Sequence, residues 1–477
     1  MTRPVPPSSP GNPPGTERTG RALAVTAGGT LLGMTAFTAP LSIVPSVAAH
    51  LAAGTVVTSW ILSSMSLGLA VALLTSGAIG DDLGRRKVFG LGAVLLAVGS
   101  ATCGVAPTPL VFILGRVVEG IGAAAVIACG LGVISHTFPP GPERLRATGV
   151  WGACMSAGPA VGPLLGSGAD ATVGWRYAYL VITGLSVALA LAGRSFLAES
   201  RSGRTTPIDV VGAGLLGLGL GCLLAALTEG RQGWTSPLEL VLIAGAVIFL
   251  VAFVVHQRRA AGPMLDLALF RRPALVSATL AAFVTGAGII GLMSFLPTVL
   301  QRGMADTAVR TALVLLGWSG VSAVASLLAR RLPAGFSGGA RMSAGLVGIA
   351  VGLIPLALLT TMSPVWQLLL GLVVAGVGTG LMNATLGREA VASVPPTSAG
   401  TGSGINNASR YVGAAFGVTV VTVLALPAAG GDPAAGLVAG WNVAVLIGIA
   451  LCLVGAVAAL LLQRADARFT AATSVHI

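Results

Sequence analysis

The sequence contains few charged residues for its length. Of its 477 residues, 9% are charged, compared with about 25% in an average soluble protein. Hydrophobic residues make up 55% of the chain, and the mean hydropathy is +0.92. The five cysteines all lie in apolar segments and show no paired spacing, so no disulfide framework is expected. This composition excludes a soluble globular protein and indicates one embedded in a membrane.

Sequence patterns for cofactors and catalysis are also missing. The four histidines are scattered at the ends of apolar runs or in the tail, so they suggest no metal site. No phosphate-binding loop is present, and ATP is therefore not expected to drive the protein. A membrane enzyme would need a polar catalytic cluster, which the sequence does not show. We therefore expect no enzyme activity, no metal and no other cofactor.

Long apolar runs recur along almost the whole chain. About 20 apolar residues in a helix are enough to cross a bilayer. We predict an all-α membrane protein with fourteen spans, at residues 22–48, 54–80, 88–107, 109–135, 147–168, 177–198, 209–228, 238–256, 274–300, 311–329, 342–362, 365–387, 400–426 and 438–463.

The distribution of positive charge predicts the orientation of these spans. Most of the 27 basic residues lie in the two tails and in alternate loops, at 81–87, 194–208, 256–272 and 329–341. Basic loops remain on the cytoplasmic side of a membrane. An even number of spans then places both termini in the cytoplasm. Because orientation explains the net charge of +12, no nucleic-acid partner is expected.

Segments of the first half of the chain recur in the second. The segment 115–122 reappears at 371–378, an offset of 371 − 115 = 256 residues, with all three of its glycines in register. One residue out of step, a second block relates the span at 147–168 to the span at 400–426. We therefore predict two six-span bundles, which flank an extra pair of spans. The predicted parts are a disordered cytoplasmic tail (1–21), the first bundle (22–198), the extra pair with its linkers (199–273), the second bundle (274–463) and a cytoplasmic tail (464–477).

A very short charged loop joins the second and third predicted spans. It reads Gly-Ala-Ile-Gly-Asp-Asp-Leu-Gly-Arg-Arg-Lys over residues 77–87 and resembles the cytoplasmic loop between spans 2 and 3 of the major facilitator superfamily. The positions that match are Gly77, Asp81, Gly84, Arg85, Arg86 and Lys87, whereas Asp82 replaces a base. A carboxylate at residue 81 is attracted to the N-terminus of a helix by about 0.3–1 kcal/mol. We expect a conformational latch, with an ordinary positive-inside turn as the alternative.

Two further segments resemble the drug:proton antiporter branch of this superfamily. In the fourth span, residues 116–122 are similar to its Arg-x-x-Gln-Gly-x-Gly motif, with Glu119 in place of glutamine. In the fifth span, residues 158–166 are similar to its Gly-Pro-x-x-Gly-Pro/Gly motif, and the matching residues are Gly158, Pro159, Gly162, Pro163 and Gly166. Prolines bend a helix, and glycines four residues apart let another helix approach closely. A bent helix that limits leak and ordinary helix packing both remain open.

The fourth span carries the candidate coupling site, formed by Arg116 and Glu119. Residues three apart share one face of a helix, so the two side chains can touch. The repeated segment has Leu372 and Ala375 at these positions, so packing does not require the charges. We expect Glu119 to carry the proton, with a static ion pair as the alternative. The aspartate usual in the family's first span is absent, because Ala36 occupies its place.

Polar residues also occur deep in the twelfth and thirteenth spans. Asn383, Asn406, Asn407 and Arg410 either line a substrate cavity or hold these helices to their neighbours. The resemblance implies a fourteen-span transporter of the bacterial inner membrane that exports drugs or antibiotics in exchange for protons. Another metabolite, exported or imported on the same fold, is the alternative. The expected partners are a small-molecule substrate, protons and the lipid bilayer, and a monomer is expected.

Overall fold

The structure is a computed structural model. It describes residues 16–201, 209–230, 236–260, 262–263, 265–331, 336–395, 399–425 and 432–474. Within these ranges every regular element is a helix, as the apolar runs predict.

The first part of the chain folds into helices that correspond to the first eight predicted spans. Their bounds are α1 (Thr16–Thr38), α2 (Pro40–His50), α3 (Thr55–Leu83), α4 (Arg85–Gly104), α5 (Pro109–Thr137), α6 (Pro142–Thr172), α7 (Arg176–Phe196), α8 (Val210–Glu229) and α9 (Pro237–Arg259).

The second part begins with a short 3-10 turn and contains two π-helical turns inside its first span. The bounds are η2 (Leu267–Arg271), α10 (Pro273–Thr285), η3 (Gly286–Ile290), α11 (Gly291–Thr298), η4 (Val299–Gly303), α12 (Ala308–Leu328), η5 (Ala329–Arg331), α13 (Gly338–Leu353), η6 (Pro355–Leu358), α14 (Val365–Ala392), α15 (Ala399–Leu424) and α16 (Pro433–Ser474).

Most of these helices are suited to cross a membrane. In the described residues, eleven helices are long and apolar enough, and the bent pair α1–α2 brings the number to twelve. The two remaining predicted spans coincide with α6 and α15, which are richer in glycine and polar residues. Such helices pack among other helices and need little lipid-facing apolar surface. The multi-pass architecture is thus confirmed, while the total of fourteen spans stays a prediction.

The first span is broken between α1 and α2, which meet at an angle of 44°. Pro40 is the first residue of α2, and proline has no N–H group to donate to the carbonyl four residues before it. The carbonyl oxygen of Ala36 therefore lacks its helical partner. This break lies next to the candidate coupling site.

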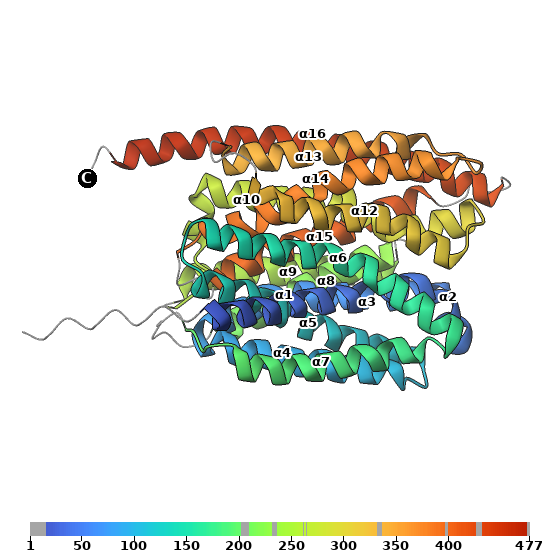
Figure 1. Ribbon diagram of the computed structural model, residues 1–477, viewed down its shortest axis with the longest axis horizontal. Helices are drawn as coiled ribbons and strands as arrows, with labels where there is room; N and C mark the ends of the chain where they lie inside the picture. The colour runs from blue at the N-terminus through green and yellow to red at the C-terminus, as the bar shows by residue number, and fades with distance from the viewer. Residues whose placement is uncertain are drawn as a thin grey trace, which may run out of the picture.

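The helices lie side by side in two groups along one common direction (Figure 1). One group has α4 and α7 at its outer side with α5 next to them toward the middle, and the other contains α13, α14 and α16 (Figure 1). Between the groups, α6 packs along α12, and α3 packs along α15. The helices of the first bundle share one large hydrophobic cluster and those of the second bundle share another. The start of α1 and the end of α16 lie at the same end of the bundle (Figure 1).

The repeated glycine segments occupy equivalent places in the two groups. In the first bundle, α5 packs between α3 and α4, and in the second, α14 packs between α12 and α13. A Cβ added at Gly120 would meet α3, and one at Gly376 would meet α12. Likewise, a Cβ at Gly122 would meet α4, and one at Gly378 would meet α13. Each glycine thus permits the same close helix approach in both copies.

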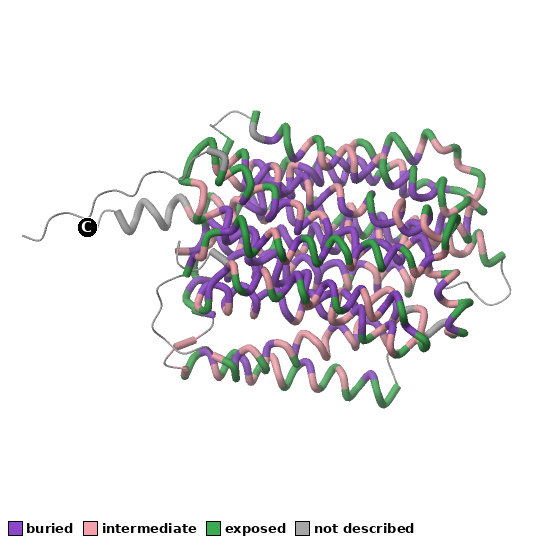
Figure 2. The backbone as a smooth tube through the Cα atoms, turned by 60° about the horizontal axis from the view of Figure 1, so that its bottom comes forward, coloured by how far each residue is buried: buried purple, intermediate pink, exposed green. Residues whose placement is uncertain are grey.

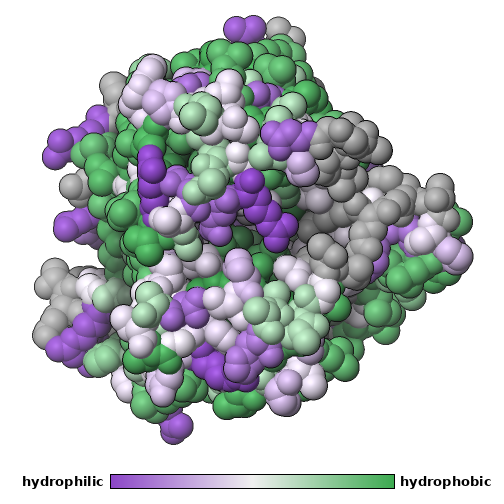
Figure 3. Space-filling view, turned by 90° about the vertical axis from the view of Figure 1, so that its right-hand side faces the viewer, coloured by the Kyte–Doolittle hydropathy of each residue, from purple (hydrophilic) through white to green (hydrophobic). Residues whose placement is uncertain are grey.

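Burial follows the expected pattern for a membrane bundle. Buried residues concentrate in the interior, and exposed ones lie on the outer helices (Figure 2). Many exposed side chains on these outer helices are large and hydrophobic, including Leu191, Val241 and Val454. Hydrophilic residues gather on the end face opposite the chain termini, while hydrophobic residues cover the flanks (Figure 3). This distribution suits a protein surrounded by lipid along its sides.

The boundaries of the two predicted tails differ from the helices. Helix α1 begins at Thr16, so residues 16–21 are helical, and residues 1–15 lie outside the described residues. Helix α16 continues through Ser474, well past the predicted end of the last span at 463. At 1.5 Å per residue its 42 residues extend about 63 Å, longer than the roughly 30 Å core of a bilayer. The helix therefore continues into the segment that was expected to be a tail.

Candidate functional site

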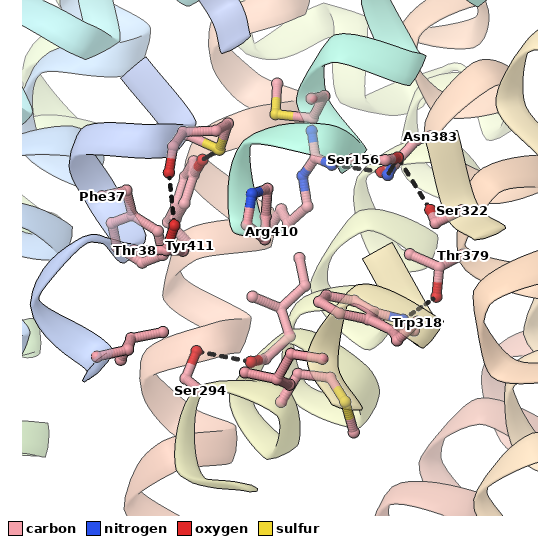
Figure 4. Close-up of a pocket in the computed structure, with 17 residues that line it drawn as sticks. Phe37, Thr38, Ser156, Ser294, Trp318, Ser322, Thr379, Asn383, Arg410 and Tyr411 are labelled. Carbon is pink, nitrogen blue, oxygen red and sulfur yellow. Dashed lines mark hydrogen bonds between the residues drawn. The ribbon is translucent and has the colours of Figure 1, made fainter. Parts of the chain in front are cut away.

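A cavity lies halfway along the bundle, between its two groups of helices. Its volume is about 50 Å³, which is room for a few water molecules, since one needs about 10–15 Å³. Both bundles contribute to its wall (Figure 4). The lining residues are Met34, Phe37, Thr38, Leu41, Met155, Ser156, Pro159, Ile290, Met293, Ser294, Leu315, Trp318, Ser322, Thr379, Asn383, Arg410 and Tyr411. The wall is thus largely apolar, with a few polar groups.

A chain of polar side chains crosses the cavity wall from one bundle to the other. The Nη1 group of Arg410, on α15, donates to Asn383 Oδ1 on α14 at 2.7 Å. The Nδ2 group of Asn383 donates to Ser156 Oγ on α6 at 2.8 Å, and Ser322 Oγ on α12 donates to the same oxygen at 2.9 Å. Asn383 and Arg410 therefore line the cavity and also hold the helices together.

The two other predicted cavity residues lie behind the wall. Asn407 Oδ1 accepts a hydrogen bond of 2.5 Å from Nη2 of Arg410, while Asn407 Nδ2 donates to the carbonyl of Ser403. Asn406 is buried, and neither its Oδ1 nor its Nδ2 has a hydrogen-bond partner among the described residues. Asn407 thus orients Arg410, and neither Asn406 nor Asn407 is among the residues that line the cavity.

The predicted pair Arg116 and Glu119 is fully buried in α5. The Nη1 group of Arg116 lies 2.7 Å from Glu119 Oε2, and both side chains are 0% exposed. The second carboxylate oxygen, Oε1, accepts a hydrogen bond of 2.5 Å from Ser100 Oγ on α4. An ion pair removed from water is stable only when hydrogen bonds satisfy both groups, and here serine and the arginine together satisfy the carboxylate.

Arg116 also supports the break in the first span. Its Nη1 group donates to the carbonyl oxygen of Ala36 at 2.7 Å, and its Nη2 group donates to that of Phe37 at 3.0 Å. The first of these is the carbonyl that Pro40 leaves without a helical donor. Phe37 belongs to the cavity wall. The ion pair and the cavity are therefore joined through the α1–α2 break.

The segment 77–87, predicted as a loop, is helical except at Gly84, because α3 continues to Leu83 and α4 begins at Arg85. This charged segment, which we continue to call the loop, reaches the opposite bundle through one carboxylate. Oδ2 of Asp81 accepts hydrogen bonds from N and Oγ1 of Thr401, at 3.0 and 3.3 Å, at the start of α15. Its Oδ1 lies 2.7 Å from Nη2 of Arg85, and both side chains are 3% exposed. Nη1 of Arg85 donates to the carbonyl of Gly132 on α5 at 3.1 Å. The expected contact between this carboxylate and a helix N-terminus is present.

The remaining residues of the loop have different roles. Gly84 has a φ of +121°, and a Cβ there would lie 2.5 Å from Glu199 Oε1, so only glycine suits this position. The Nε group of Arg86 lies 3.8 Å from Glu199 Oε2. Gly77 is buried within α3, whereas Lys87 is exposed and free to face the membrane surface. Arg85 and Arg86 therefore anchor the loop on its own bundle, through Gly132 and Glu199, and Asp81 anchors it on the other.

The glycines of the fifth-span motif face the broken first span. Cβ atoms added at Gly158 and Gly162 would each lie 2.2 Å from an atom of α1, and one at Gly166 would lie 2.7 Å from the carbonyl oxygen of Ala39, between α1 and α2. Pro159 and Pro163 lie inside the continuous helix α6. Proline lacks an N–H group, so Pro159 and Pro163 leave the carbonyls of Met155 and Pro159 without their helical donors. A separate hydrogen bond of 2.9 Å, from Ser42 Oγ to the carbonyl of Pro163, joins α2 to α6. Close packing between α6 and the first span is thus present.

Several lining residues were not identified from the sequence. Aromatic side chains at Phe37, Trp318 and Tyr411 form part of the wall, and Trp318 Nε1 donates to Thr379 Oγ1 at 3.1 Å. Ser156 and Ser322 link the two bundles. Single serines and aromatic residues are common in membrane helices, so the sequence does not mark these residues as part of a cavity. The one available signal was the mid-span position of the polar residues Ser156 and Ser322. The described residues contain no group of three side chains able to hold a metal ion.

Comparison with known proteins gives a consistent result. The family profile described as Major Facilitator Superfamily matches residues 26–418. The chain is 32% identical over 435 residues to the probable actinorhodin transporter of Streptomyces coelicolor, covering 88% of this chain and 75% of that one. It is 30% identical to the puromycin resistance protein pur8 of Streptomyces alboniger, covering 87% and 85%. The fold is similar to a crystal structure of the human organic anion transporter MFSD10 (TETRAN), with a TM-score of 0.65, 18% identity and coverage of 91% and 99%.

Proposed function

The chain belongs to the major facilitator superfamily, and from that membership and the geometry of its buried sites we propose that it is a secondary active transporter that exports drug-like or antibiotic-like molecules across the inner membrane in exchange for protons. Relatives at about 30% identity are named as a transporter of actinorhodin and as a puromycin resistance protein, which supports export of such molecules. The fourteen spans, with both termini cytoplasmic, belong to this proposal.

The observation that carries the proposal is the buried Arg116–Glu119 pair beside a cavity shared by both bundles. Transporters commonly bind their substrate near the midplane, at the interface between two halves. An ionisable pair within a membrane span is a functional candidate by default, because burying it is costly. The second copy of the repeat keeps the glycines but has no charges, so helix packing alone does not explain the pair.

Alternating access requires a bundle interface that can open on either side. In the structure the loop end of the bundle is closed, since Asp81 contacts the start of α15 across the interface. We propose that this contact is a latch that holds the cytoplasmic side closed while the opposite side is accessible. A latch of a few hydrogen bonds biases a two-state equilibrium without locking it.

Proton and substrate would be coupled through Arg116. In our proposal, protonation of Glu119 removes the charge that holds Nη1 of Arg116, and the guanidinium group then shifts relative to the carbonyls of Ala36 and Phe37. Movement at this break changes the position of Phe37 and Thr38 in the cavity wall. This proposal also accounts for the acid that the first span lacks. The carbonyl of Ala36 accepts a hydrogen bond from Arg116, and Glu119 takes the place of the missing acid as the carboxylate partner of that arginine.

Transport into everted membrane vesicles tests the proposed function. A susceptibility panel in an efflux-deficient bacterial host first identifies compounds that the protein removes. Uptake of such a compound by energised everted vesicles should then stop when an uncoupler collapses the proton gradient. Uptake that persists unchanged with the uncoupler would contradict proton exchange. Uptake by intact cells would indicate an importer, and the absence of any affected compound in the panel would favour another metabolite.

A further inference from the structure

Arg410 brings a positive charge to the cavity wall, and no carboxylate among the described residues pairs with it. The residue is 2% exposed. Its Nη1 and Nη2 groups donate to the side-chain amides of Asn383 and Asn407, which are neutral. Its Nε group is buried and has no acceptor among the described residues. A guanidinium group has five N–H donors, so most of its capacity to donate remains unused.

The surroundings of Arg410 do not neutralise its charge. None of the seventeen residues that line the cavity is aspartate or glutamate. Glu119 is already paired with Arg116 and bonded to Ser100. A buried charge without a counter-charge is expensive to maintain in a membrane, and such residues mark substrate or ion pathways. Amide oxygens from two asparagines orient the guanidinium group, but they are neutral and do not compensate its positive charge.

The rest of the wall is suited to an apolar body. Phe37, Trp318 and Tyr411 present aromatic rings, and Met34, Met155 and Met293 present flexible thioether side chains. Methionine-rich surfaces adapt to ligands of different shape. Ligand sites typically combine such an apolar lining with a few polar groups that fix the orientation of the ligand.

Arg410 lies at the cavity wall (Figure 4). From these two features we propose that the cavity, when the bundles move apart and widen it beyond its present volume of about 50 Å³, takes organic anions with an aromatic or otherwise apolar body and one carboxylate or similar acidic oxygen group that binds Arg410. This inference rests on the proposed transport function and specifies its substrate class. A cation would meet an uncompensated like charge, and a neutral ligand would leave the Nε donor without a charged acceptor. Arginine binds a carboxylate through two parallel hydrogen bonds, which fixes both its position and its plane.

An anion at Arg410 would also act on the contact between the bundles. Asn383 accepts from Arg410 and donates to Ser156 of the other bundle. Nη1 carries two N–H groups and Asn383 accepts from one of them, so a carboxylate that accepts from the other draws the guanidinium group away from Asn383. Binding of the anion therefore weakens one connection in the hydrogen-bond chain that joins the second bundle to the first.

The test measures binding to the full-length protein in lipid nanodiscs by calorimetry, with empty nanodiscs as the baseline. The probes are 2-naphthoate, its neutral analogue 2-naphthamide and the cation 2-naphthylmethylammonium, which share one aromatic body. We expect the wild type to bind 2-naphthoate about tenfold or more tightly than 2-naphthamide, because hydrogen bonds to ionised groups are about twice as strong. Arg410→Gln should weaken 2-naphthoate binding about tenfold or more and leave 2-naphthamide within about twofold.

Two further variants serve as controls. Arg388→Gln removes the same charge from α14, but Arg388 is paired with Glu389 outside the cavity wall, so binding of all three probes should stay unchanged. Arg410→Lys keeps the charge without the two-pronged geometry, and should keep a preference for 2-naphthoate even if Arg410→Gln fails to fold. Loss of that preference in Arg388→Gln would contradict the assignment.

Three results would overturn the proposal. These are equal affinity of the wild type for 2-naphthoate and 2-naphthamide, tighter binding of the cation, or displacement of 2-naphthoate by millimolar chloride, which would assign Arg410 to an inorganic anion. The binding assay needs no proton gradient. A protein that binds 2-naphthoate but transports nothing in vesicles would refute the transport function alone, whereas export of neutral and cationic compounds without anion binding would refute only the substrate class.

Discussion

Replacing Asp81 by asparagine should loosen the contact between the bundles at the loop end. The two hydrogen bonds from Thr401 to Asp81 cross the interface, whereas the ion pair with Arg85 stays within the first bundle. Only the two hydrogen bonds from Thr401 are therefore expected to differ between the closed and open states. A hydrogen bond to a charged acceptor contributes about 1.5–3 kcal/mol and one to a neutral acceptor about 0.5–1.5 kcal/mol. Both bonds end on the single oxygen Oδ2, so we count them as one charge-assisted interaction, and loss of the charge should cost the closed state about 1–2 kcal/mol, a factor of about 5–30 in the ratio of closed to open protein.

Labelling of a buried cysteine measures this shift. Ser403 lies on α15 near the latch and is 0% exposed in the closed state. In a chain whose five native cysteines are replaced, Ser403→Cys should react with N-ethylmaleimide about 5–30 times faster when Asp81→Asn is added. Substrate transport should fall more than membrane abundance, and Arg85→Ala should have the same effect on transport.

The neighbouring acid provides the matched control. Asp82→Asn removes one negative charge at the adjacent position without touching the bonds to Thr401, so labelling should stay the same or slow down. If Asp81→Asn labels at the parental rate, the contact does not hold the interface closed. Normal transport by both Asp81→Asn and Arg85→Ala would remove the latch from the mechanism.

Three further predictions concern the buried sites. Glu119→Gln should abolish proton-dependent efflux while substrate counterflow survives, and Ala36→Asp in that background should restore it, because the backbone carbonyl of residue 36 accepts a hydrogen bond from Arg116. An unchanged pH dependence of efflux in Glu119→Gln would contradict the role of Glu119 as proton carrier. Replacement of both Pro159 and Pro163 by alanine should raise passive proton leak or abolish export in proteoliposomes, and wild-type efflux without leak would reduce them to packing. Gly162→Ala should lower the yield of folded protein on size-exclusion chromatography, because its methyl group would lie 2.2 Å from an atom of the first span, whereas Gly168→Ala, with open space, should not.

The helices themselves were largely predictable from the sequence. In a bilayer every backbone N–H and C=O group needs an internal partner, so a long apolar run can only be a helix. The same physics explains why the α1–α2 break was not predicted. Pro40 leaves the carbonyl of Ala36 without its helical donor, and the donor that replaces it, Arg116, comes from a helix 80 residues away in the sequence. The structure also explains why α6 and α15 are less apolar than the other helices: neighbouring helices, and not lipid, surround them.

The candidate site was predictable residue by residue but not as an arrangement. The pair Arg116 and Glu119 was identified because residues three apart on a helix must meet, and its 2.7 Å contact is set by local geometry. No comparable local rule predicts which residues face the cavity. Whether Asn383 or Asn406 faces the cavity depends on how each helix is rotated against its neighbours, which periodicity in a helix apolar on all sides does not indicate.

The sequence by itself determined the class of the protein, the helical spans, the internal repeat and the charged loop, because hydropathy, spacing and composition act through neighbours along the chain. Only the tertiary structure decided that Asp81 meets Thr401, 320 residues away, and that Arg410 reaches the cavity with no acid beside it. Contacts of this kind depend on the packing of whole bundles, whose many small van der Waals and hydrogen-bond terms are not encoded in any short segment.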